Sequence, residues 1–245
     1  MIFQPPNNFL RLDHRRGVWE DPFMPTSERT FESHSCTQHL RNSGNLHLQY
    51  LVKRCMDLLG AGILIVALLP VFIVIGLLVV LDDGWPVIYR RRVLGTTGEF
   101  DALKFRTMVR DADSILAANP ALKAEFERNF KLKDDPRITG VGAFLRKLSL
   151  DELPQLFNVL RGQMSLVGPR MITAAELHKY GPYEQLLLSV KPGLTGYWQV
   201  RGRQNVSYEE RVRMDLHYLG TWSLSLDMKI LFETPVKALK REGAF

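Results

Sequence analysis

The sequence predicts a membrane-associated, mainly α-helical protein with one small β-hairpin. Three observations lead to this fold class: a long apolar run without charges, two strand-like segments joined by GTTGE, and helical spacing of apolar residues through most of the remaining chain. We expect a mobile polar tail over residues 1–50, a membrane helix over residues 51–83, and a cytosolic domain over residues 84–245.

The apolar run covers residues 58–81, which are 24 residues without a charge, and about 20 suffice to cross the hydrocarbon core as a helix. Basic residues lie on both sides of it, at 53–54 and at 90–92, so neither orientation of a simple span satisfies the positive-inside rule. Pro70, near the centre, removes an amide donor and kinks a helix. These features predict a kinked, re-entrant helix that enters and leaves on the cytosolic side. An ordinary span with a tolerated proline fits the run equally well.

A hairpin and a series of helices are expected after the apolar run. The segments PVIYRRRVL and FDALKFRTM flank the turn-like GTTGE and predict two paired strands. Apolar spacing then predicts helical regions over residues 108–130 with a break at Asn119-Pro120, 142–163, 172–193 with a break at Gly181-Pro182, and 206–242.

The last of these regions is typical of two amphipathic helices. Such helices are suited to rest on a membrane surface with aromatic side chains at the interface. Trp198, Trp222 and Tyr218 are candidates for these interfacial anchors, and ordinary core packing is the equally open alternative for each.

The charge balance narrows the class of partner. The chain has 32 Lys+Arg against 26 Asp+Glu and a net charge of +6, which suits nucleic acid, anionic lipid or phosphorylated substrates. Nucleic-acid binding leaves the apolar run unexplained, so we expect no nucleic-acid partner. Two cysteines imply no disulfide framework.

Two adjacent carboxylates, Asp151 and Glu152, stand in LSLDELPQLFNVL. Ser149-x-x-Glu152 matches a capping box, but with Ser149 as N-cap, Pro154 would delete an intrahelical hydrogen bond. A helix that begins at about Asp151 instead places both carboxylates at its N-terminus, where the dipole stabilises them. The pair alone leaves two interpretations open. It either caps a helix, or it takes part in chemistry, by sharing one Mg²⁺ or through attack of one carboxylate on phosphorus.

Cationic side chains that suit phosphate oxygens are spread over the same domain. Singly, each of them is more simply a solvated surface charge. Together with acidic metal ligands they indicate a pyrophosphate substrate. The candidates are Lys104, Arg106, Arg137, Arg146, Lys147, Arg170, Arg201 and Arg203.

At this point the motifs KFRTM, DDPRIT, LRKLSLDELPQLFNVLRGQMSLVGPR, KPGLTGYWQVRGR and YLGTWSLSLDMKIL are recognisable. Over about residues 50–245, the chain resembles the bacterial sugar transferases, which are small monotopic polyprenyl-phosphate hexose-1-phosphate transferases. The motifs occur in the same order as in that family. Without the extra membrane spans of longer members, it is similar to their short form, and its context is similar to members that initiate exopolysaccharide synthesis.

The resemblance implies an enzyme on the cytosolic face of the inner membrane that uses Mg²⁺, a UDP-sugar donor and undecaprenyl phosphate as acceptor. In the family the Asp of the dyad is the nucleophile, so Asp151 would carry a covalent phospho-sugar after UMP leaves. Glu152 would hold or orient Mg²⁺, with Asp151 as the other metal ligand. The expected phosphate- and substrate-binding residues are Lys104, Arg106, Arg146, Arg170, Arg203 and Asp227.

Two positions depart from the family pattern: Met171 follows Arg170 where proline is frequent, and Leu69 precedes Pro70 where serine is common. The second departure bears on the kink. The resemblance favours galactose over glucose as the transferred sugar and leaves an N-acetylhexosamine open. A catalytically idle membrane scaffold for polysaccharide assembly is the alternative from another class, and a homodimer is left open.

Overall fold

The computed structural model describes residues 11–13, 18–20, 30–31, 43–129, 132, 135–202 and 206–239. The chain divides into two compact units, Met1–Met56 and Asp57–Phe245. The first unit holds a three-stranded antiparallel sheet, with strands β1 (Arg11–Asp13), β2 (Val18–Glu20) and β3 (Thr30–Phe31) in that order. Strands of two or three residues are too short to show alternation of apolar and polar residues, so this sheet was not predicted.

Two helices in series form the apolar segment. They are α2 (Ser43–Ala67), which begins inside the expected polar tail, and α3 (Leu69–Asp83), and they are bent by 63° at their junction. Pro70 lies in the first turn of α3, where its missing amide removes no intrahelical hydrogen bond, so the predicted break at this proline is confirmed. Neither helix alone is long and apolar enough to cross a membrane. In the described part of the chain, this bent pair alone has the combined length and composition to do so.

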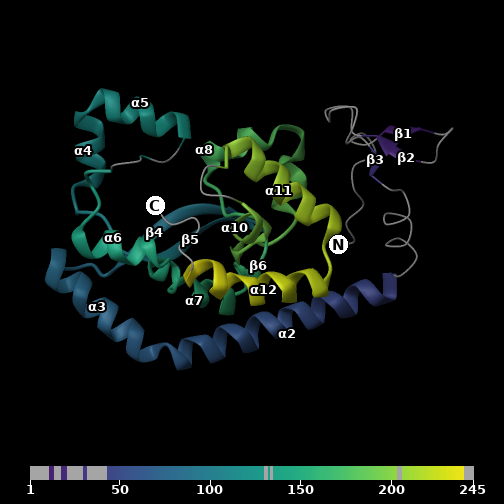
Figure 1. Ribbon diagram of the computed structural model, residues 1–245, viewed down its shortest axis with the longest axis horizontal. Helices are drawn as coiled ribbons and strands as arrows, with labels where there is room; N and C mark the ends of the chain where they lie inside the picture. Colours follow the sequence, from purple (N-terminus) through teal and green to yellow (C-terminus); the bar gives the residue numbers. More distant parts are fainter. Residues whose placement is uncertain are drawn as a thin grey trace. The chain divides into compact units, whose positions relative to one another are not determined.

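The second unit is mainly helical, as predicted, and contains the expected antiparallel hairpin (Figure 1). Its strands are β4 (Ile88–Gly95) and β5 (Gly98–Phe105). Tyr89 pairs with Lys104. Paired residues project to one face of a hairpin, and so do residues two positions apart along a strand. The hairpin therefore directs Arg91 and Lys104 to the same face.

Mostly short helices complete this unit, and the predicted breaks between them are confirmed. Pro120 begins a helix, and Gly181 interrupts another with a φ of 52°. In chain order the helices, with η for 3₁₀ helices, are α4 (Ala112–Ala118), α5 (Pro120–Asn129), α6 (Gly140–Lys147), η1 (Leu150–Glu152), α7 (Gln155–Leu160), α8 (Ala174–Leu177), η2 (His178–Tyr183), α9 (Glu184–Leu188), α10 (Tyr197–Arg201), α11 (Tyr208–Thr221) and α12 (Leu224–Leu239). The last two are the pair of C-terminal helices expected from the sequence.

A parallel pair of short strands was not predicted. These are β6 (Ser165–Val167) and β7 (Gly193–Thr195). All three residues of β6 are buried, so the segment shows no alternation that would reveal a strand. A Cβ on Gly193 would collide with the backbone nitrogen of Gly168, which explains why glycine occupies this crossing.

A buried carboxylate fastens α2 to this small sheet. Asp57 accepts hydrogen bonds from the Ser165 hydroxyl and from the Leu166 amide, each at 2.9 Å. One turn further along α2, Ala61 is fully buried in the main hydrophobic core beside Leu156. The apolar helix is thus part of the core of the second unit as well as part of its surface.

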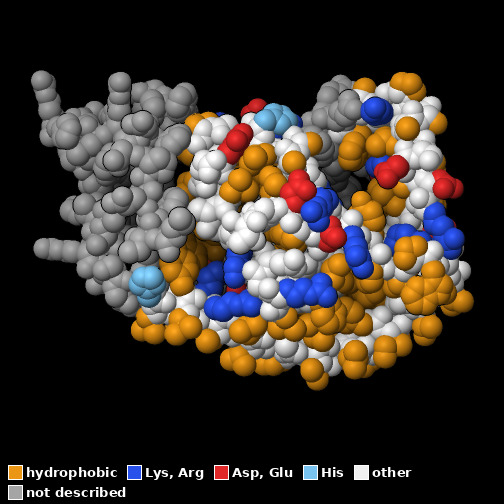
Figure 2. All heavy atoms as spheres, turned by 180° about the vertical axis from the view of Figure 1, so that it is seen from behind, with side chains coloured by type: hydrophobic (Ala, Val, Ile, Leu, Met, Phe, Trp, Pro, Cys, Tyr) orange, Lys and Arg blue, Asp and Glu red, His pale blue; other side chains and the backbone are white. Residues whose placement is uncertain are grey.

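Hydrophobic side chains gather along one edge of the second unit, and Lys and Arg side chains lie next to them (Figure 2). Exposed residues of the bent pair include Leu59, Ile63, Val66, Ile73, Val74, Leu77 and Leu81. Exposed apolar side chains elsewhere include Phe157 and Leu160 of α7 and Phe232 and Val236 of α12.

Two of the three aromatic residues proposed as interfacial anchors lie in or against the hydrophobic core. Tyr218 is only 3% exposed and lies in the main core. Trp222 packs against the same core. For these two residues the core-packing alternative is confirmed and the interfacial interpretation is wrong, because both help to join α11 to α12.

Candidate active site

The acidic dyad lies in the turn between α6 and α7. Ser149 adopts a left-handed φ of 55°, and η1 then carries Asp151 and Glu152 before α7 begins at Gln155. The Ser149 side chain caps no helix amide, so the capping-box interpretation is wrong. The expectation of one helix starting at Asp151 is also wrong, because Pro154 is the N-cap residue of α7 and the dyad precedes it.

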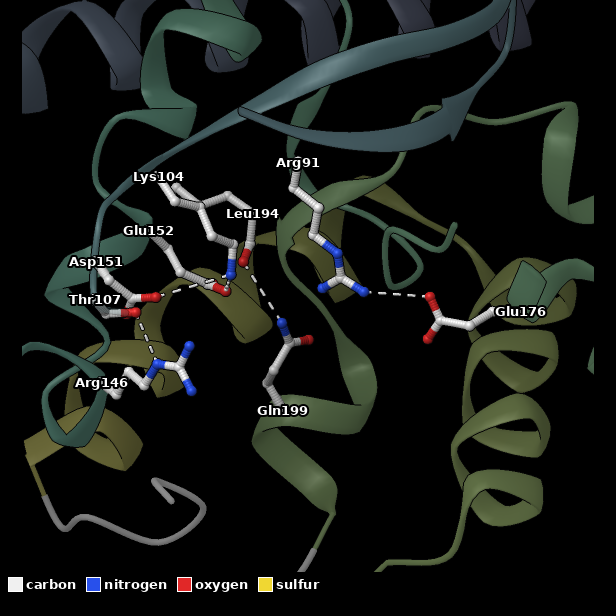
Figure 3. A network of polar contacts seen from close by, with 9 residues as sticks. All are labelled: Arg91, Lys104, Thr107, Arg146, Asp151, Glu152, Glu176, Leu194 and Gln199. Carbon is white, nitrogen blue, oxygen red and sulfur yellow. Dashed lines mark hydrogen bonds and ion pairs between the residues drawn. The ribbon is translucent and has the colours of Figure 1, made fainter. Parts of the chain in front are cut away.

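The Lys104 ammonium approaches both carboxylates and lies nearer to that of Glu152 (Figure 3). Its Nζ is 2.5 Å from Glu152 Oε1 and 3.9 Å from Asp151 Oδ2. Asp151 is 8% exposed. The hairpin and η1, distant in sequence, thus bring one cation and two anions to a largely buried place, as the sequence predicted for a site around the dyad.

The two carboxylates differ in how readily they ionise. Burial raises the pKa of Asp151 above its usual range, and the Lys104 charge opposes this rise without cancelling it. Burial also acts to raise the pKa of Glu152, but the charge and hydrogen bond of Lys104 prevail and leave that pKa below its usual range. Glu152 is therefore a firmly held anion, whereas Asp151 is a poorly solvated carboxylate, which is a more reactive state for a nucleophile.

Arg146 supplies a second cation on the other side of Asp151. The last turn of α6 carries it, and its Nε donates a hydrogen bond of 2.9 Å to Thr107 Oγ1. Burial lowers the pKa of Arg146, and the charge of Asp151 acts in the opposite direction. The expected placement of Arg146 near the dyad is what the structure shows (Figure 3).

Arg91 and Glu176 were missed by the sequence analysis. Arg91 Nη2 lies 3.3 Å from Oε2 of Glu176, which is fully buried and also accepts hydrogen bonds from the amide and hydroxyl of Thr173. The charge of Arg91 contributes to the lowered pKa of Glu152, which places it at the same site. The available signal was the alternation in YRRRV, which puts Arg91 on the face of Lys104.

Arg170 follows β6, and its charge contributes to the lowered pKa of Glu152. Its backbone amide donates a 3.3 Å hydrogen bond to Asp215 of α11, a fully buried carboxylate. Asp215 is thus a support of the loop that carries Arg170. Its position seven residues into a helix gave no sequence signal for such a role.

Two other expected site residues have different partners. Arg106 Nη2 donates to the carbonyl oxygens of Asp83 and Gly84, at 2.8 and 2.7 Å, and so holds the C-terminal end of α3. Asp227 accepts hydrogen bonds from Tyr218 Oη at 2.7 Å and from Trp222 Nε1 at 3.1 Å. These contacts make Arg106 and Asp227 structural. The expected phosphate ligand Arg203 lies outside the described residues.

The dyad fits a Mg²⁺ ion that substrate phosphates help to bind. Within the described ranges, no group of three or more His, Cys, Asp or Glu side chains is placed to hold a metal ion. Mg²⁺ keeps several waters and is typically bound by one or two carboxylates together with substrate phosphates. Asp151 and Glu152 supply such a pair of hard oxygen ligands, and the nearby Lys104 ammonium shows that a cation is stable beside both.

Comparison with known proteins agrees with the resemblance seen in the motifs. The family described as bacterial sugar transferase matches residues 48–241. The chain is 47% identical over 236 residues to a UDP-galactose-lipid carrier transferase of Erwinia amylovora, covering 94% of this chain and 49% of that protein. It is 47% identical over 195 residues to the exopolysaccharide production protein ExoY of Sinorhizobium fredii, covering 77% and 86% of the two chains.

A third relative is the undecaprenyl-phosphate galactose phosphotransferase of Salmonella typhimurium, with 46% identity over 199 residues, or 79% of this chain and 42% of that protein. The chain thus spans about half the length of the first and third of these relatives and most of the second. Because the family model matches most of the sequence, the chain belongs to the bacterial sugar transferase family.

Proposed function

We propose that the protein transfers a hexose-1-phosphate from a UDP-sugar to undecaprenyl phosphate and releases UMP. The observation that carries this proposal is the buried Asp151 beside Glu152, with the cations Lys104 and Arg146 turned toward the pair. UDP-galactose and undecaprenyl phosphate occur in the names of two relatives, which supports these classes of donor and acceptor.

In the first step, a carboxylate oxygen of Asp151 attacks the phosphorus that bears the sugar. The bond from this phosphorus to the bridging oxygen of the diphosphate breaks, and its electron pair leaves with UMP. Burial of Asp151 favours the attack because few water molecules stabilise the free carboxylate. Lys104 and Arg146 offset the negative charge that gathers at the reacting phosphate.

In the second step, a phosphate oxygen of undecaprenyl phosphate attacks the same phosphorus. The bond to Asp151 breaks, the carboxylate is regenerated, and the product is the undecaprenyl diphosphate sugar. Mg²⁺, when bound by Asp151 and Glu152, would neutralise phosphate charge in both steps. Arg91, held by Glu176, and Arg170 add positive charge near Glu152.

The bent helix pair suits a lipid-linked acceptor. The acceptor phosphate lies at the headgroup level while its tail stays in lipid, so the catalytic groups must work at the interface. A re-entrant placement of α2 and α3, supported by the 63° bend and by the apolar edge of the second unit, would hold the dyad there on the cytosolic face of the inner membrane. The apolar side chains of α7 and α12 on this edge fit the same placement.

We favour galactose as the transferred sugar and the first step of exopolysaccharide repeat-unit synthesis as the role. Galactose occurs in the names of two relatives and exopolysaccharide production in that of the third. Glucose and an N-acetylhexosamine are the competing sugars, and competition among the UDP-sugars in one reaction identifies the donor.

The decisive experiment measures UMP release from UDP-galactose and UDP-glucose by the purified protein with Mg²⁺, with and without undecaprenyl phosphate. We expect Asp151→Asn to lower acceptor-dependent release at least about a thousandfold while the melting temperature stays unchanged. Glu152→Gln should raise the Mg²⁺ concentration needed for half-maximal activity. The exposed Asp111→Asn serves as the matched control and should behave as the wild type.

Without acceptor, a covalent mechanism releases at most one UMP per chain in a burst. Continuous release that needs the acceptor from the first turnover would instead indicate direct transfer. Folded protein that is silent with every UDP-sugar would favour the idle scaffold.

A further inference from the structure

Two arginines share one aromatic ring next to the dyad. The Cζ atoms of Arg170 and Arg211 lie 5.2 and 5.0 Å from the centroid of the Trp198 ring. Arg211 belongs to α11 and Trp198 to α10. The residue that follows Trp198, Gln199, belongs to the same close-up as Lys104 and Glu152, so α10 borders the active site (Figure 3).

The Nε atoms of Arg170 and Arg211 are both buried without a hydrogen-bond partner among the residues that the structure describes. Asp215 is the adjacent carboxylate, but its oxygens are engaged by the Tyr180 hydroxyl at 2.8 Å and by the backbone amide of Arg170. A buried N–H group without a hydrogen-bond partner is costly, and a ligand that accepts from these Nε atoms would offset that cost.

The like charges also oppose each other. Burial lowers the pKa of Arg211, and the charge of Arg170 lowers it further. The two cations stack on one ring, and the attraction of each to the ring offsets only part of this repulsion. An anion with more than one negative charge would relieve this repulsion and the loss of hydration together.

Other unpaired groups at the same place can donate hydrogen bonds. Trp198 Nε1 and Tyr208 Oη are both buried without a partner. Tyr208 is close to Arg170 and Arg211, since both charges act on its pKa, which burial raises. Glu176 Oε1 is a buried unpaired acceptor whose charge also reaches Tyr208 and Arg211, but donors outnumber it here, and the arginine fork fits phosphate oxygens in particular.

We propose that Arg170, Trp198 and Arg211 form a clamp for the phosphate of the leaving nucleoside monophosphate. The inference rests on the proposed function and extends it to the group that departs. Asp151 attacks the sugar-bearing phosphorus, and the adjacent phosphate of the diphosphate leaves in line with that attack. Arg170 stacks on Trp198, and Trp198 belongs to α10, which borders the active site, so the clamp lies beside the dyad.

The clamp stabilises the charge of the leaving group in the first step. When the bond between phosphorus and the bridging oxygen breaks, the bridging oxygen takes the electron pair and the departing UMP gains one negative charge. Two guanidinium groups fixed before the reaction neutralise that charge as it develops. The clamp therefore lowers the barrier to release of UMP and also gives the enzyme a product-binding site.

The test is a binding measurement that needs no turnover. Isothermal titration calorimetry compares UMP with uridine, which lacks the phosphate, on the full-length protein in detergent micelles. We expect the wild type to bind UMP more tightly than uridine. Arg211→Gln should weaken UMP binding about 10- to 100-fold, the loss expected for hydrogen bonds to a charged group, and leave uridine unchanged. Arg211→Lys, which keeps the charge without the fork, should fall between the two.

The matched control is Arg213→Gln, an exposed arginine on the same helix, which should leave both affinities unchanged. Equal UMP affinity in wild type and Arg211→Gln would overturn the clamp, and so would a wild type that does not distinguish UMP from uridine. Turnover separates the two proposals. If the protein is active but Arg211→Gln does not change its UMP affinity, only the clamp proposal fails. If the protein is inactive with every UDP-sugar but binds UMP through its phosphate, the clamp proposal stands and the transferase proposal fails.

Discussion

Asp215 shows how much one buried side chain determines at this site. It is fully buried, accepts the Tyr180 hydroxyl and the Arg170 amide, and has no exposure to water that would stabilise its charge. Burial raises its pKa to about 6, and the hydrogen bonds from Tyr180 and Arg170 limit the rise. Ionisation of Asp215 therefore opposes folding, although the same side chain supports the loop that carries Arg170.

This ionisation predicts a pH-dependent stability. A carboxylate with a raised pKa in the folded state contributes most below its unfolded value of 3.8, and the contribution is lost as the pH rises through about 6. The difference corresponds to about 3 kcal/mol. We expect the unfolding free energy to fall by up to this amount between about pH 4 and pH 8, and Asp215→Asn to remove the fall.

Urea unfolding in detergent at several pH values measures this slope. The exposed Asp111→Asn should keep the wild-type slope. A slope that Asp215→Asn leaves intact would mean that another group is responsible.

Among single residues, prediction from sequence succeeded where a motif fixes both the residue and its direction. Asp151, Glu152, Lys104 and Arg146 meet as expected. Arg106 belongs to the same KFRTM motif, two residues after Lys104, but it follows the last residue of β5, so the strand no longer sets its direction, and it binds the end of α3 instead. Glu176 was missed because a buried acid in a four-residue helix looks in sequence like an ordinary cap.

At the scale of elements, the junction between α3 and the hairpin depends on arginines. Arg106 and Arg110 both donate to the carbonyl oxygen of Asp83, and Arg106 also reaches Gly84. Cations at a helix C-terminus satisfy its last carbonyls and interact favourably with its dipole. The orientation of β4 relative to α3 is therefore set by side chains from the end of β5 and the turn after it.

Arg106→Gln is expected to lower stability by about 1 to 3 kcal/mol, since it weakens hydrogen bonds made by a charged group. The KM for the UDP-sugar should stay within about twofold of wild type if the residue is purely structural. Thermal unfolding and initial-rate kinetics test the two halves of this prediction. A large rise in KM with unchanged stability would restore Arg106 to the substrate site.

Asp57 joins two elements that are more than 100 residues apart. Asp57→Ala leaves the Leu166 amide and the Ser165 hydroxyl buried without an acceptor, and we expect a loss of about 2 to 4 kcal/mol. Asp57→Asn keeps an acceptor oxygen and should lose much less. The measurement is the shift in unfolding midpoint of both variants, and equal losses would show that charge, not hydrogen bonding, is what Asp57 supplies.

At the scale of the whole molecule, the sequence predicted the helical class, the hairpin and the break at Pro70. It did not predict the two small sheets, because their strands are only two or three residues long, and β6 and β7 are in addition far apart in the chain. Nor did it predict that α2 would enter the hydrophobic core through Ala61. A run of apolar residues shows that every face of the helix is apolar, but it does not show which face packs against the rest of the protein.

The placement of the bent pair predicts which side of the membrane its two ends occupy. Cys55 is an exposed free thiol near the start of the apolar run, and Trp85, 70% exposed, follows its end. In a Cys36→Ser background, we expect Cys55 and a thiol introduced by Trp85→Cys to react with an impermeant maleimide in inside-out vesicles. Neither should react in right-side-out vesicles. Labelling of the two thiols from opposite sides would establish an ordinary span.

Asp57 and Ala61 have a practical consequence for making a water-soluble form of this protein. Deleting the apolar helices would remove part of the core and expose the donors of β6, so the remaining domain would lose its fold along with its anchor. Redesign of the outward positions alone, such as Leu59, Ile63 and Val66, to polar residues retains every contact that α2 makes with the domain. Only the outward side chains of α2 can be replaced, because its inward side belongs to the core of the domain.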